Sequence, residues 1–359
     1  MKIGVFAYPH YRTPPEKYGP IQTVTYGLIR ELAKRGHKVT AFASGDSDIP
    51  CKKISVKETP DMDDHTVPDA KIYEQASLQE LLKYRESFDV LSSHVSFHIL
   101  PLLELLNYPV AVNLQGTYTN PHYKKVFYYY KEANFVSISN KQREQLPDLN
   151  YVATVYHGIE LDKFSFNLRP KEQLGFLGRT NPLKGLDVAI KVAKETNQKL
   201  IIGAREDKDE LSRKFFAEKI EPQIDNKSIV WLGERDAKEK VELLKNSKAL
   251  IFPINWEEAF GLVMIEAMAC GTPVIGFRRG SVPEVVVEGK TGFICPAGNI
   301  GAMRKAVEKI FEMTDEEYQE MRKNCRRHVE ENFTVEKMVD GYERVYQQLV
   351  KDWKKKNGK

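Results

Sequence analysis

Short, almost entirely apolar segments alternate with amphipathic helical patterns along most of this chain. In the first half these segments are residues 2–8, 38–44, 88–94, 109–115 and 134–139, and in the second half residues 173–179, 199–204, 228–233, 249–254, 273–277 and 292–296. Apolar strands without polar alternation are typical of parallel sheets that helices cover on both faces. Because the strand–helix pattern runs through twice, we predict two doubly wound, Rossmann-like α/β domains.

The length of 359 residues also exceeds the usual size of a single core, which agrees with two domains. The polar stretch 164–173 separates the two runs, so we predict an N-terminal domain of residues 1–165 and a C-terminal domain of residues 166–335. The charged segment 314–333 and the tail after it have helical patterns. We expect these last helices to be peripheral.

The composition narrows the class of protein. A formal net charge of +4 is too small to indicate a nucleic-acid partner. The four cysteines are far apart and form no CxxC pair, which predicts reduced thiols in a cytoplasmic protein. No apolar run approaches the ~18 residues that a membrane-spanning helix needs. The stretch 122–135 mixes aromatic residues with lysines, and it fits a peripheral contact with the inner face of a membrane, an acceptor platform or a packed helix.

Several short motifs are present but incomplete. Residues 46–48 and 61–63 both read Asp-X-Asp, which can clamp a metal diphosphate, but they lie in polar segments and are expected to be solvated loops. His94 and His98 have the spacing of zinc helices but lack the glutamate after the first histidine. No GxGxxG follows any predicted strand. We therefore predict no metal site and no dinucleotide cofactor.

The stretch 249–271 predicts a strand, a loop and a helix that together form a binding site. Glu258 lies in the loop at the carboxyl end of the strand, and Phe260, Gly261 and Leu262 lie at the start of the helix. The first N–H groups of a helix have no partner within it and favour anions. Glu266, further along this helix, has the chemistry to hold a ribose diol.

Two cations are predicted at the same edge of the sheet. The strand at residues 173–179 reaches Gly178 and Arg179, and Lys184 follows in the next loop. Arginine binds phosphate oxygens through its planar fork and lysine acts as a point charge, so together they can neutralise a diphosphate. In the first domain, Gly19 and Pro20 form a turn that leads into a helix N-terminus.

These motifs resemble the retaining glycosyltransferases of family four, which have the GT-B fold of two Rossmann-like domains facing across a cleft. The resemblance extends to about residue 333 and is carried by EAFGLVMIE at 258–266, GRTNPLKG at 178–185, the first-domain stretch 18–45, and the segments 157–164 and 280–295. It implies transfer of a sugar from a nucleotide diphosphate sugar to a glycan, lipid or small-molecule acceptor. UDP is the first choice and GDP the second, without a bound metal. It also implies that residues 336–359 form a helix that crosses back to the acceptor-side N-terminal domain.

The resemblance assigns roles to individual residues. By analogy, Arg179 and Lys184 hold the diphosphate, Glu258 and the backbone of residues 260–262 hold sugar hydroxyls, and Glu266 holds the ribose. The turn at Gly19 closes on the phosphates. Residues expected to shape the base pocket are Gly203, Glu234 and Arg235.

Two positions depart from the family pattern. Gln115 stands where the family often has a histidine near the reacting sugar, and Pro20 replaces the second glycine of the usual turn. Glutamine can donate and accept hydrogen bonds but cannot become cationic. We count Gln115 with Arg179, Lys184 and Glu258 as the catalytic set, and His94 is an alternative contributor. A non-catalytic nucleotide-sugar binder and a nucleotide-sugar epimerase are the alternative functions.

Overall fold

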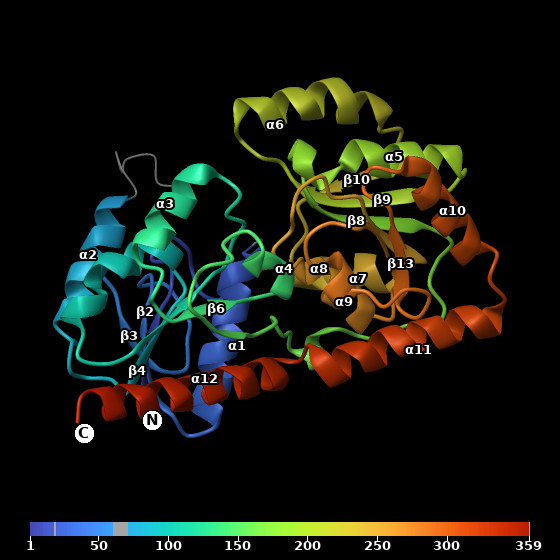
Figure 1. The fold of residues 1–359 in the computed structure, drawn as a ribbon. Coiled ribbons are helices and arrows are strands. Elements are labelled where there is room, and N and C mark those ends of the chain that lie inside the picture. The colour runs from blue at the N-terminus through green and yellow to red at the C-terminus, as the bar shows by residue number, and fades with distance from the viewer. Residues whose placement is uncertain (18, 60–70, 359) are drawn as a thin grey trace. The chain divides into compact units, whose positions relative to one another are not determined.

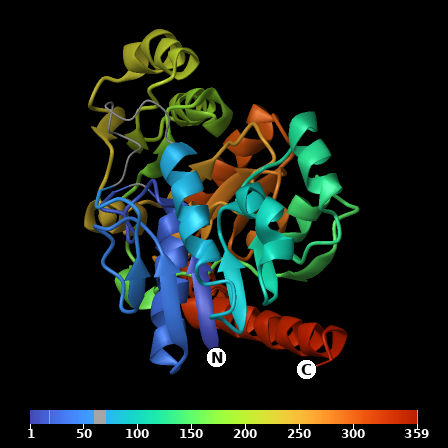
Figure 2. The same ribbon diagram turned by 90° about the vertical axis from the view of Figure 1, so that its left-hand side faces the viewer.

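A computed structural model describes residues 1–17, 19–59 and 71–358 of the chain. The chain folds into two units: unit 1 comprises Met1–Gly158 and Val335–Lys359, and unit 2 comprises Ile159–Thr334 (Figure 1). Both labelled ends of the chain belong to unit 1 (Figure 2). Unit 2 begins before the polar stretch, because the Ile159 N–H donates to the Phe333 carbonyl at 2.9 Å and ties its first residues to its last.

Unit 1 is built on a parallel sheet, which has seven strands among the described residues, in the order β3-β2-β1-β4-β5-β6-β7. The strands are β1 (Lys2–Phe6), β2 (Lys38–Phe42), β3 (Lys52–Ile54), β4 (Val90–Ser93), β5 (Val110–Asn113), β6 (Phe135–Ser137) and β7 (Tyr151–Thr154). Five of them were predicted. The sequence analysis missed β3 and β7, which lie at the two edges and are partly exposed, so they lack the apolar runs of the central strands.

The helices of unit 1 follow these strands. They are α1 (Pro20–Lys34), α2 (Lys71–Leu82), the 3₁₀ segment η1 (Ser96–Leu105), α3 (Pro121–Tyr129), α4 (Asn140–Arg143) and α12 (Val335–Lys356). Asn120 caps α3 by accepting from the His122 N–H, and Pro20 and Pro121 open α1 and α3 at positions where no N–H is needed. Helix α12, from the end of the chain, packs on α1, β4 and β5.

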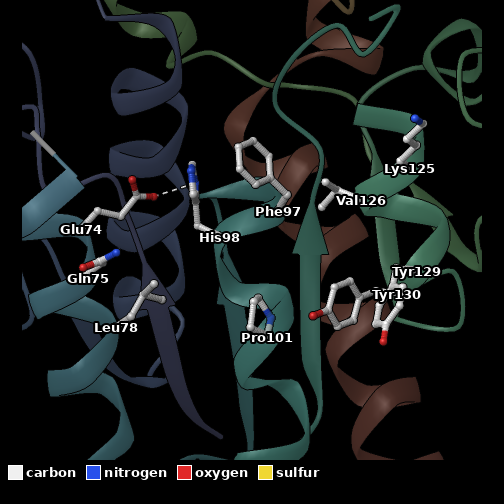
Figure 3. Close-up of a pocket in the computed structure, with 10 residues that line it drawn as sticks. All are labelled: Glu74, Gln75, Leu78, Phe97, His98, Pro101, Lys125, Val126, Tyr129 and Tyr130. Carbon is white, nitrogen blue, oxygen red and sulfur yellow. Dashed lines mark ion pairs between the residues drawn. The ribbon is translucent and has the colours of Figure 1, made fainter. Parts of the chain in front are cut away.

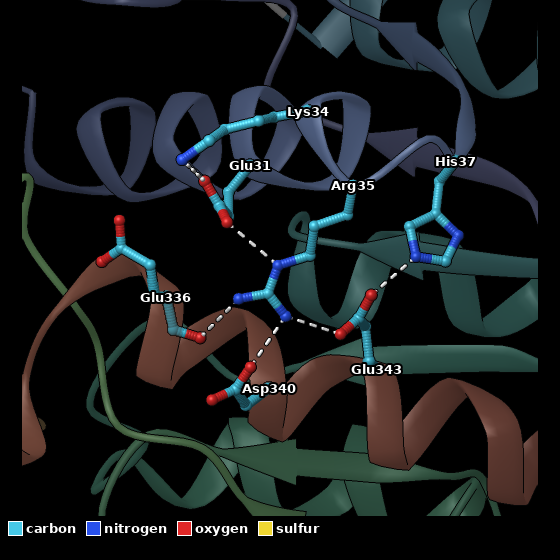
Figure 4. A network of polar contacts seen from close by, with 7 residues as sticks. All are labelled: Glu31, Lys34, Arg35, His37, Glu336, Asp340 and Glu343. Atoms are coloured by element: carbon cyan, nitrogen blue, oxygen red, sulfur yellow. Dashed lines mark hydrogen bonds and ion pairs between the residues drawn. The ribbon is translucent and has the colours of Figure 1, made fainter.

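Ion pairs fasten α12 to the end of α1 (Figure 4). The Arg35 guanidinium reaches the carboxylates of Asp340 and Glu343 at 2.7 and 2.6 Å and also bonds Glu31 of its own helix. His37 Nε2 lies 2.7 Å from the other oxygen of Glu343. A network of several charges contributes more than isolated surface pairs do. It therefore joins the last helix of the chain to the first.

Unit 2 is built on a second parallel sheet, and the six strands predicted for it are confirmed. Its order is β10-β9-β8-β11-β12-β13. The strands are β8 (Leu174–Arg179), β9 (Leu200–Arg205), β10 (Ile229–Gly233), β11 (Ala249–Phe252), β12 (Val274–Phe277) and β13 (Gly292–Cys295). Figure 1 shows helices on both faces of this sheet. The α-helices are α5 (Leu186–Glu195), α6 (Glu210–Phe215), α7 (Ala237–Lys245), α8 (Leu262–Ala269), α9 (Val282–Val285), α10 (Ile300–Phe311) and α11 (Asp315–Asn332), with the short segments η2 (Leu161–Lys163), η3 (Pro182–Lys184), η4 (Phe216–Ile220) and η5 (Glu221–Gln223) between them.

The strand order of each sheet reverses once. In unit 1 the reversal lies between β1 and β4, and in unit 2 it lies between β8 and β11. At such a point the loops after the two neighbouring strands diverge to opposite faces and leave room at the carboxyl edge, where open α/β sheets bind ligands. The loops after β1, β4, β8 and β11 are therefore the places to look for a site.

The prediction that the C-terminal helices are peripheral is wrong. In α11, Arg322 is fully buried, and its guanidinium donates to backbone carbonyls of Asn167, Ser247, Lys245 and Cys270. It also contacts the Tyr318 hydroxyl at 2.9 Å. The carbonyls of Lys245 and Cys270 end α7 and α8, where helix dipoles favour a cation. One buried arginine thus closes the ends of two helices.

We expect Arg322→Met to lower the free energy of unfolding of unit 2 by about 3 kcal/mol, because it leaves several buried carbonyls without a donor. Urea unfolding followed by tryptophan fluorescence in a Trp353→Phe background measures this, because Trp231 and Trp256 then report on unit 2 alone. Arg327→Met, at an exposed position of the same helix, is the matched control. An equal, small effect of both substitutions would contradict the capping role.

Candidate functional site

Arg179 lies at the end of β8, on the carboxyl edge of the unit 2 sheet. Its Nη1 atom is 3.4 Å from Asp207 Oδ1, and 31% of its side chain is exposed. Asp207 is buried, and its backbone N–H donates to Thr180 Oγ1 at 3.0 Å. Gly178, also predicted, precedes Arg179 in the same strand. The sequence analysis did not identify Asp207, which holds the guanidinium at this edge.

Lys184 and Glu258 are brought together across the point where the strand order reverses. Lys184 ends η3, after β8, and Glu258 lies in the loop after β11. Lys184 Nζ is 2.7 Å from Glu258 Oε2, with side-chain exposures of 14% and 13%. Trp256 Nε1 donates to the same carboxylate oxygen at 3.1 Å, and the ammonium lies 4.6 Å from the centre of the Trp256 ring. The site thus holds a largely buried cation whose partner is itself a predicted ligand residue.

Two glycines allow this approach of loops. Gly185 has a φ of 70°, and a Cβ there would overlap the Pro253 carbonyl oxygen. Gly280 has a φ of 49°, and a Cβ there would overlap the backbone of Glu258. Ser281, next in the chain, donates its N–H to the Glu258 carbonyl at 3.0 Å and its hydroxyl to the Phe260 carbonyl at 2.6 Å. The loop after β12 therefore positions Glu258.

Helix α8 starts beside this carboxylate. Gly261 is its N-cap, with a φ of 76°, while Phe260 is buried and Leu262 begins the helix. A Cβ at Gly261 would lie 3.4 Å from Glu258 Cγ and 2.9 Å from Met264 Cε. Backbone N–H groups at the start of a helix attract negative charge. An anion near α8 would meet both these groups and Lys184.

Glu266 is buried on α8 and forms an ion pair with Lys240 of α7. The Lys240 ammonium also lies 5.6 Å from the centre of the Phe164 ring. The sequence analysis did not identify Lys240, because nothing local shows that α7 and α8 are neighbours. A diol that binds the Glu266 carboxylate has to share it with Lys240 or displace Lys240 from it.

The residues predicted for the base pocket lie where β9 and β10 end. Gly203 is buried in β9, and a Cβ there would lie 2.9 Å from Leu243 Cδ1 and 3.0 Å from Arg235 Cγ. Arg235 bonds Glu239 at 2.9 Å, and Glu234 is half-buried beside it. Gly203 and Arg235 are thus close, and the glycine also makes room for α7.

In unit 1 the predicted residues follow β1 and β5. Gly19 caps α1 with an extended φ of 177°, and a Cβ there would lie 2.7 Å from Pro15 Cβ, so the turn leaves no room for a side chain. Gln115 follows β5, and its amide lies 2.9 Å from His94 Nδ1. His94, the alternative contributor, is fully buried after β4. The two residues are thus in contact with each other.

A pocket of about 650 Å³ opens between α2, η1 and α3 of unit 1 (Figure 3). At one end Glu74 forms an ion pair with His98 at 2.6 Å and with His10 at 3.6 Å. Burial by itself raises the pKa of Glu74, but hydrogen bonds from His10 and His98 outweigh burial and lower it to about 2. Apolar and aromatic side chains form much of the wall. The lining residues are Glu74, Gln75, Leu78, Phe97, His98, Pro101, Lys125, Val126, Tyr129 and Tyr130.

Helix α3, which covers the first part of residues 122–135, has one buried face and one exposed face. Phe127 packs into the core, while Tyr129 is 84% exposed and Val126 is 40% exposed at the pocket. The packed-helix interpretation therefore accounts for one face only. The other face gives the pocket an aromatic rim with Lys125 beside it.

The first of the two Asp-X-Asp motifs lies in a segment held by local hydrogen bonds. Asp46 accepts from Ser44 Oγ at 2.7 Å, and the N–H of Asp48 donates to the Thr13 carbonyl. The second Asp-X-Asp, at 61–63, lies outside the described residues. No group of three histidine, cysteine or carboxylate side chains suited to a metal ion occurs in residues 1–17, 19–59 and 71–358. Over the same ranges, every helix is too short or too polar to cross a bilayer.

Two family models match the chain in succession. The model described as Glycosyltransferase Family 4 matches residues 21–163, and the model described as Glycosyl transferases group 1 matches residues 159–328. Among curated proteins, the chain is similar to N-acetyl-alpha-D-glucosaminyl L-malate synthase of Bacillus anthracis, with 39% identity over 133 residues. This match covers 36% of the chain and spans about a third, 33%, of that relative's length.

Solved structures match over nearly the whole chain. Sucrose-phosphate synthase from Thermosynechococcus elongatus aligns with a TM-score of 0.78 and 18% identity, covering 97% of this chain and 98% of that one. HepE of Anabaena in complex with UDP and glucose aligns with a TM-score of 0.76 and 14% identity, covering 97% and 100%. At these identities the likeness shows a shared fold.

Substituting Gly280 tests whether the loop after β12 positions Glu258. We expect Gly280→Ala to displace Glu258 and to destabilise unit 2, because the new methyl group overlaps the backbone of Glu258. The control is Gly289→Ala, which has a similar φ of 71° and open space around it, and should cost only about 1 kcal/mol from its backbone conformation. Thermal unfolding measures the change in stability, and a crystal structure of each variant shows the position of Glu258. Equal effects of the two substitutions would refute the positioning.

Buried neutral histidines make unit 1 sensitive to acid. Burial lowers the pKa of His94 to about 3, and burial together with the nearby His94 lowers the pKa of His157 to about 3. An unfolded histidine binds a proton near pH 6.5, so the unfolded chain takes up more protons between pH 6.5 and 3. We expect stability to fall with decreasing pH in this window by up to about 1.4 kcal/mol per pH unit for each histidine. Urea midpoints of wild type and His94→Asn between pH 5 and 8 measure it, and an unchanged slope in the variant would contradict the assignment.

Proposed function

Because this chain belongs to the family 4, group 1 glycosyltransferases and has the GT-B fold, we propose that it transfers a sugar from a UDP-sugar to an acceptor with retention of the anomeric configuration. UDP is favoured because the similar HepE structure contains UDP and glucose, and a GDP-sugar is the second choice. In this reaction the bond between the anomeric carbon and the diphosphate oxygen breaks, a bond to the acceptor oxygen forms, and the acceptor's proton leaves with the UDP.

The observation that carries the proposal is the Lys184–Glu258 pair beside the start of α8, where the strand order reverses. A largely buried lysine needs an anionic partner, and Glu258 provides it in this structure. When a diphosphate arrives, it can take the place of Glu258 at the ammonium and at the free N–H groups of α8. Glu258 is then available to accept hydrogen bonds from the hydroxyls of the sugar.

The transfer step needs positive charge at the departing phosphate. Negative charge grows on that group as its bond to the sugar breaks, so fixed donors there lower the barrier. In the proposed mechanism Arg179 and Lys184 supply them, and Glu266 exchanges Lys240 for the ribose hydroxyls. The chain's own cations take the role that a divalent metal has in other transferases, and we propose that transfer needs no metal.

Unit 1 is the proposed acceptor side. The pocket of Figure 3 joins the exposed Tyr129 ring and the Lys125 ammonium at its rim to an apolar wall. Sugar rings and apolar groups stack on aromatic faces, and a lysine favours a negatively charged acceptor. The name of the Bacillus relative contains L-malate, which is an anion. We therefore propose an acceptor that combines a ring or apolar group with a negative charge.

A panel of nucleotide sugars tests the function. UDP-glucose, UDP-N-acetylglucosamine and their GDP counterparts are added to the chain in thermal shift assays, since ligands that bind the native state raise the unfolding temperature. Transfer is then assayed with and without EDTA, and NMR of the product gives its anomeric configuration. Binding without turnover would favour the non-catalytic binder, isomerisation of the free nucleotide sugar would favour the epimerase, and an inverted product would refute retention.

Substituting Lys184 and substituting Glu258 should affect the affinity for UDP differently. Lys184→Met should weaken UDP binding about 10-fold or more, because a charge-assisted contact is lost. Glu258→Gln should leave UDP binding unchanged or tighter, since it removes the carboxylate that competes for Lys184, and should lower kcat about 100-fold. Lys290→Met, at an exposed turn of unit 2, is the control. If Glu258→Gln and Lys184→Met weakened UDP binding equally, the exchange mechanism would be wrong.

A further inference from the structure

The pocket of unit 1 has a polar end where residues of three elements meet (Figure 3). His10 follows β1, Glu74 lies in the first turn of α2, and His98 lies in η1. The Glu74 carboxylate is buried between the two histidines, with Oε2 3.6 Å from His10 Nε2 and Oε1 2.6 Å from His98 Nδ1. What this end offers to a ligand therefore depends on where the protons of the rings lie.

Glu74 determines which nitrogen of His98 carries a proton. Burial raises the pKa of Glu74, but hydrogen bonds from the histidines outweigh burial and lower it to about 2, so the carboxylate is ionised at neutral pH. His98 Nδ1 also lies 3.0 Å from the Val95 carbonyl oxygen. An ionised carboxylate and a carbonyl can only accept hydrogen bonds, so Nδ1 carries a proton. In the neutral ring, Nε2 is then a hydrogen-bond acceptor.

The surroundings hold the His98 ring in this orientation. The Phe97 ring packs on it with centroids 3.9 Å apart, and the Tyr8 ring meets it edge to face at 6.5 Å. Turning the ring over would put a carbon atom in the place of Nδ1, 2.6 Å from a carboxylate oxygen. Carbon and oxygen atoms do not approach so closely without a bond. Nδ1 therefore stays at Glu74, and Nε2 points away from the carboxylate.

His98 Nε2 is within reach of a ligand. Neither a hydrogen bond nor an ion pair engages it within residues 1–17, 19–59 and 71–358. The atom is not fully enclosed, and 26% of the His98 side chain is exposed where it lines the pocket. The pocket thus offers an accessible acceptor at its polar end.

The rest of the pocket fits a ring that carries a negative charge. Leu78, Phe97 and Val126 contribute to its apolar wall, Tyr129 gives it an aromatic rim, and Lys125 is exposed beside that rim. The volume of about 650 Å³ is typical of pockets that bind small organic molecules. The pocket therefore combines an acceptor at one end, an apolar wall and a cation at the rim.

We propose that this pocket binds the acceptor substrate as a hydroxylated ring compound with an anionic group. A hydroxyl of the ligand donates a hydrogen bond to His98 Nε2, the ring lies on the apolar wall, and the anionic group lies beside Lys125. Glu74 is a positioning residue that keeps the proton of His98 on Nδ1. The inference rests on the proposed function only in naming the ligand as the acceptor, because every group that it uses belongs to unit 1.

Three cinnamates test the ligand class on the wild-type chain. The probes are 4-hydroxycinnamate, 4-methoxycinnamate and cinnamate, which share the ring and the carboxylate, and only the first has a hydroxyl that can donate. We expect 4-hydroxycinnamate to bind about 5-fold more tightly than the other two, because it gains a hydrogen bond. A pocket without an acceptor would favour the methyl ether, which buries more apolar surface. Chemical-shift titrations of ¹⁵N-labelled protein measure the affinities and locate the binding site.

His98→Phe tests the residue. A phenyl ring keeps the aromatic packing but has no nitrogen, so the order of affinities should reverse in favour of 4-methoxycinnamate. His122→Phe makes the same change at an exposed position of α3 and should keep the wild-type order. Thermal unfolding shows whether both variants are folded. If His98→Phe does not fold because Glu74 has lost a partner, the wild-type affinities and the tautomer of His98 decide.

The tautomer can be measured on the wild-type chain. Two-bond proton–nitrogen correlations show which nitrogen of the neutral His98 ring carries the proton. The spectrum of His98→Gln, whose amide can still donate to Glu74, identifies the signals that belong to His98. We expect the proton on Nδ1, and we expect the Nε2 signal to shift when 4-hydroxycinnamate binds.

Four results would overturn the proposal. They are equal affinities or a preference for the methyl ether in wild type, an unchanged preference for the hydroxyl in folded His98→Phe, a proton on Nε2 of the neutral ring, and no binding of any of the three probes at the pocket. None of these measurements uses a nucleotide sugar. If the probes bind as expected and wild type turns over no nucleotide sugar, the proposed function fails and the binding site stands.

Discussion

The ion pair between Lys184 and Glu258 is the interaction on which the rest of the site depends. Both groups are mostly withdrawn from water, so each needs the other as a partner. The pair forms because β8 and β11 are neighbours in the sheet while their loops diverge, and because Gly185 and Gly280 let those loops pass close to other backbone. Trp256 adds an N–H to the carboxylate and a ring face to the ammonium. Under the proposed function, the diphosphate replaces Glu258 as the partner of this lysine.

The carboxyl edges of the two sheets have different electrostatic characters. In unit 2 the edge carries ion pairs: Arg179 with Asp207, Lys184 with Glu258, and Lys240 with Glu266 beside it. In unit 1 the cluster around His94 is neutral and is held by hydrogen bonds alone. Fixed charges favour an anionic ligand group, whereas neutral hydrogen-bonding groups favour uncharged polar ones. The two units therefore differ in the chemistry that each offers at the carboxyl edge of its own sheet.

The end of the chain contributes to both units. Helix α11 buries Arg322 against the carboxyl ends of α7 and α8. Helix α8 is the helix that carries Glu266. Helix α12 gives Tyr346 to the cluster that holds Gln115, and Asp340 and Glu343 to the guanidinium of Arg35. These buried contacts could not be predicted from the sequence, in which both helices are highly charged. A buried arginine that binds carbonyls and a solvated arginine look alike in sequence. Only the acceptors distinguish them, and those come from distant parts of the chain.

Much of this architecture follows from local sequence. The central strands, the helices after them and the loop positions of Arg179, Lys184, Glu258 and Gly261 were predictable, because apolar periodicity and glycine positions act over a few residues. The partners of these residues were not. Asp207, Lys240 and Trp256 were missed, and Gly280 attracted attention only as part of a family segment, because their roles depend on which strands are neighbours and on how far each loop reaches. Likewise Gln115 in the sequence is a glutamine in place of a histidine, and only the packing of β4 beside β5 brings its amide into contact with His94. The sequence by itself determines the chemical type of each side chain. Only the tertiary structure decides how a side chain is oriented and which partners it has, because distant segments compete for the same buried hydrogen bonds.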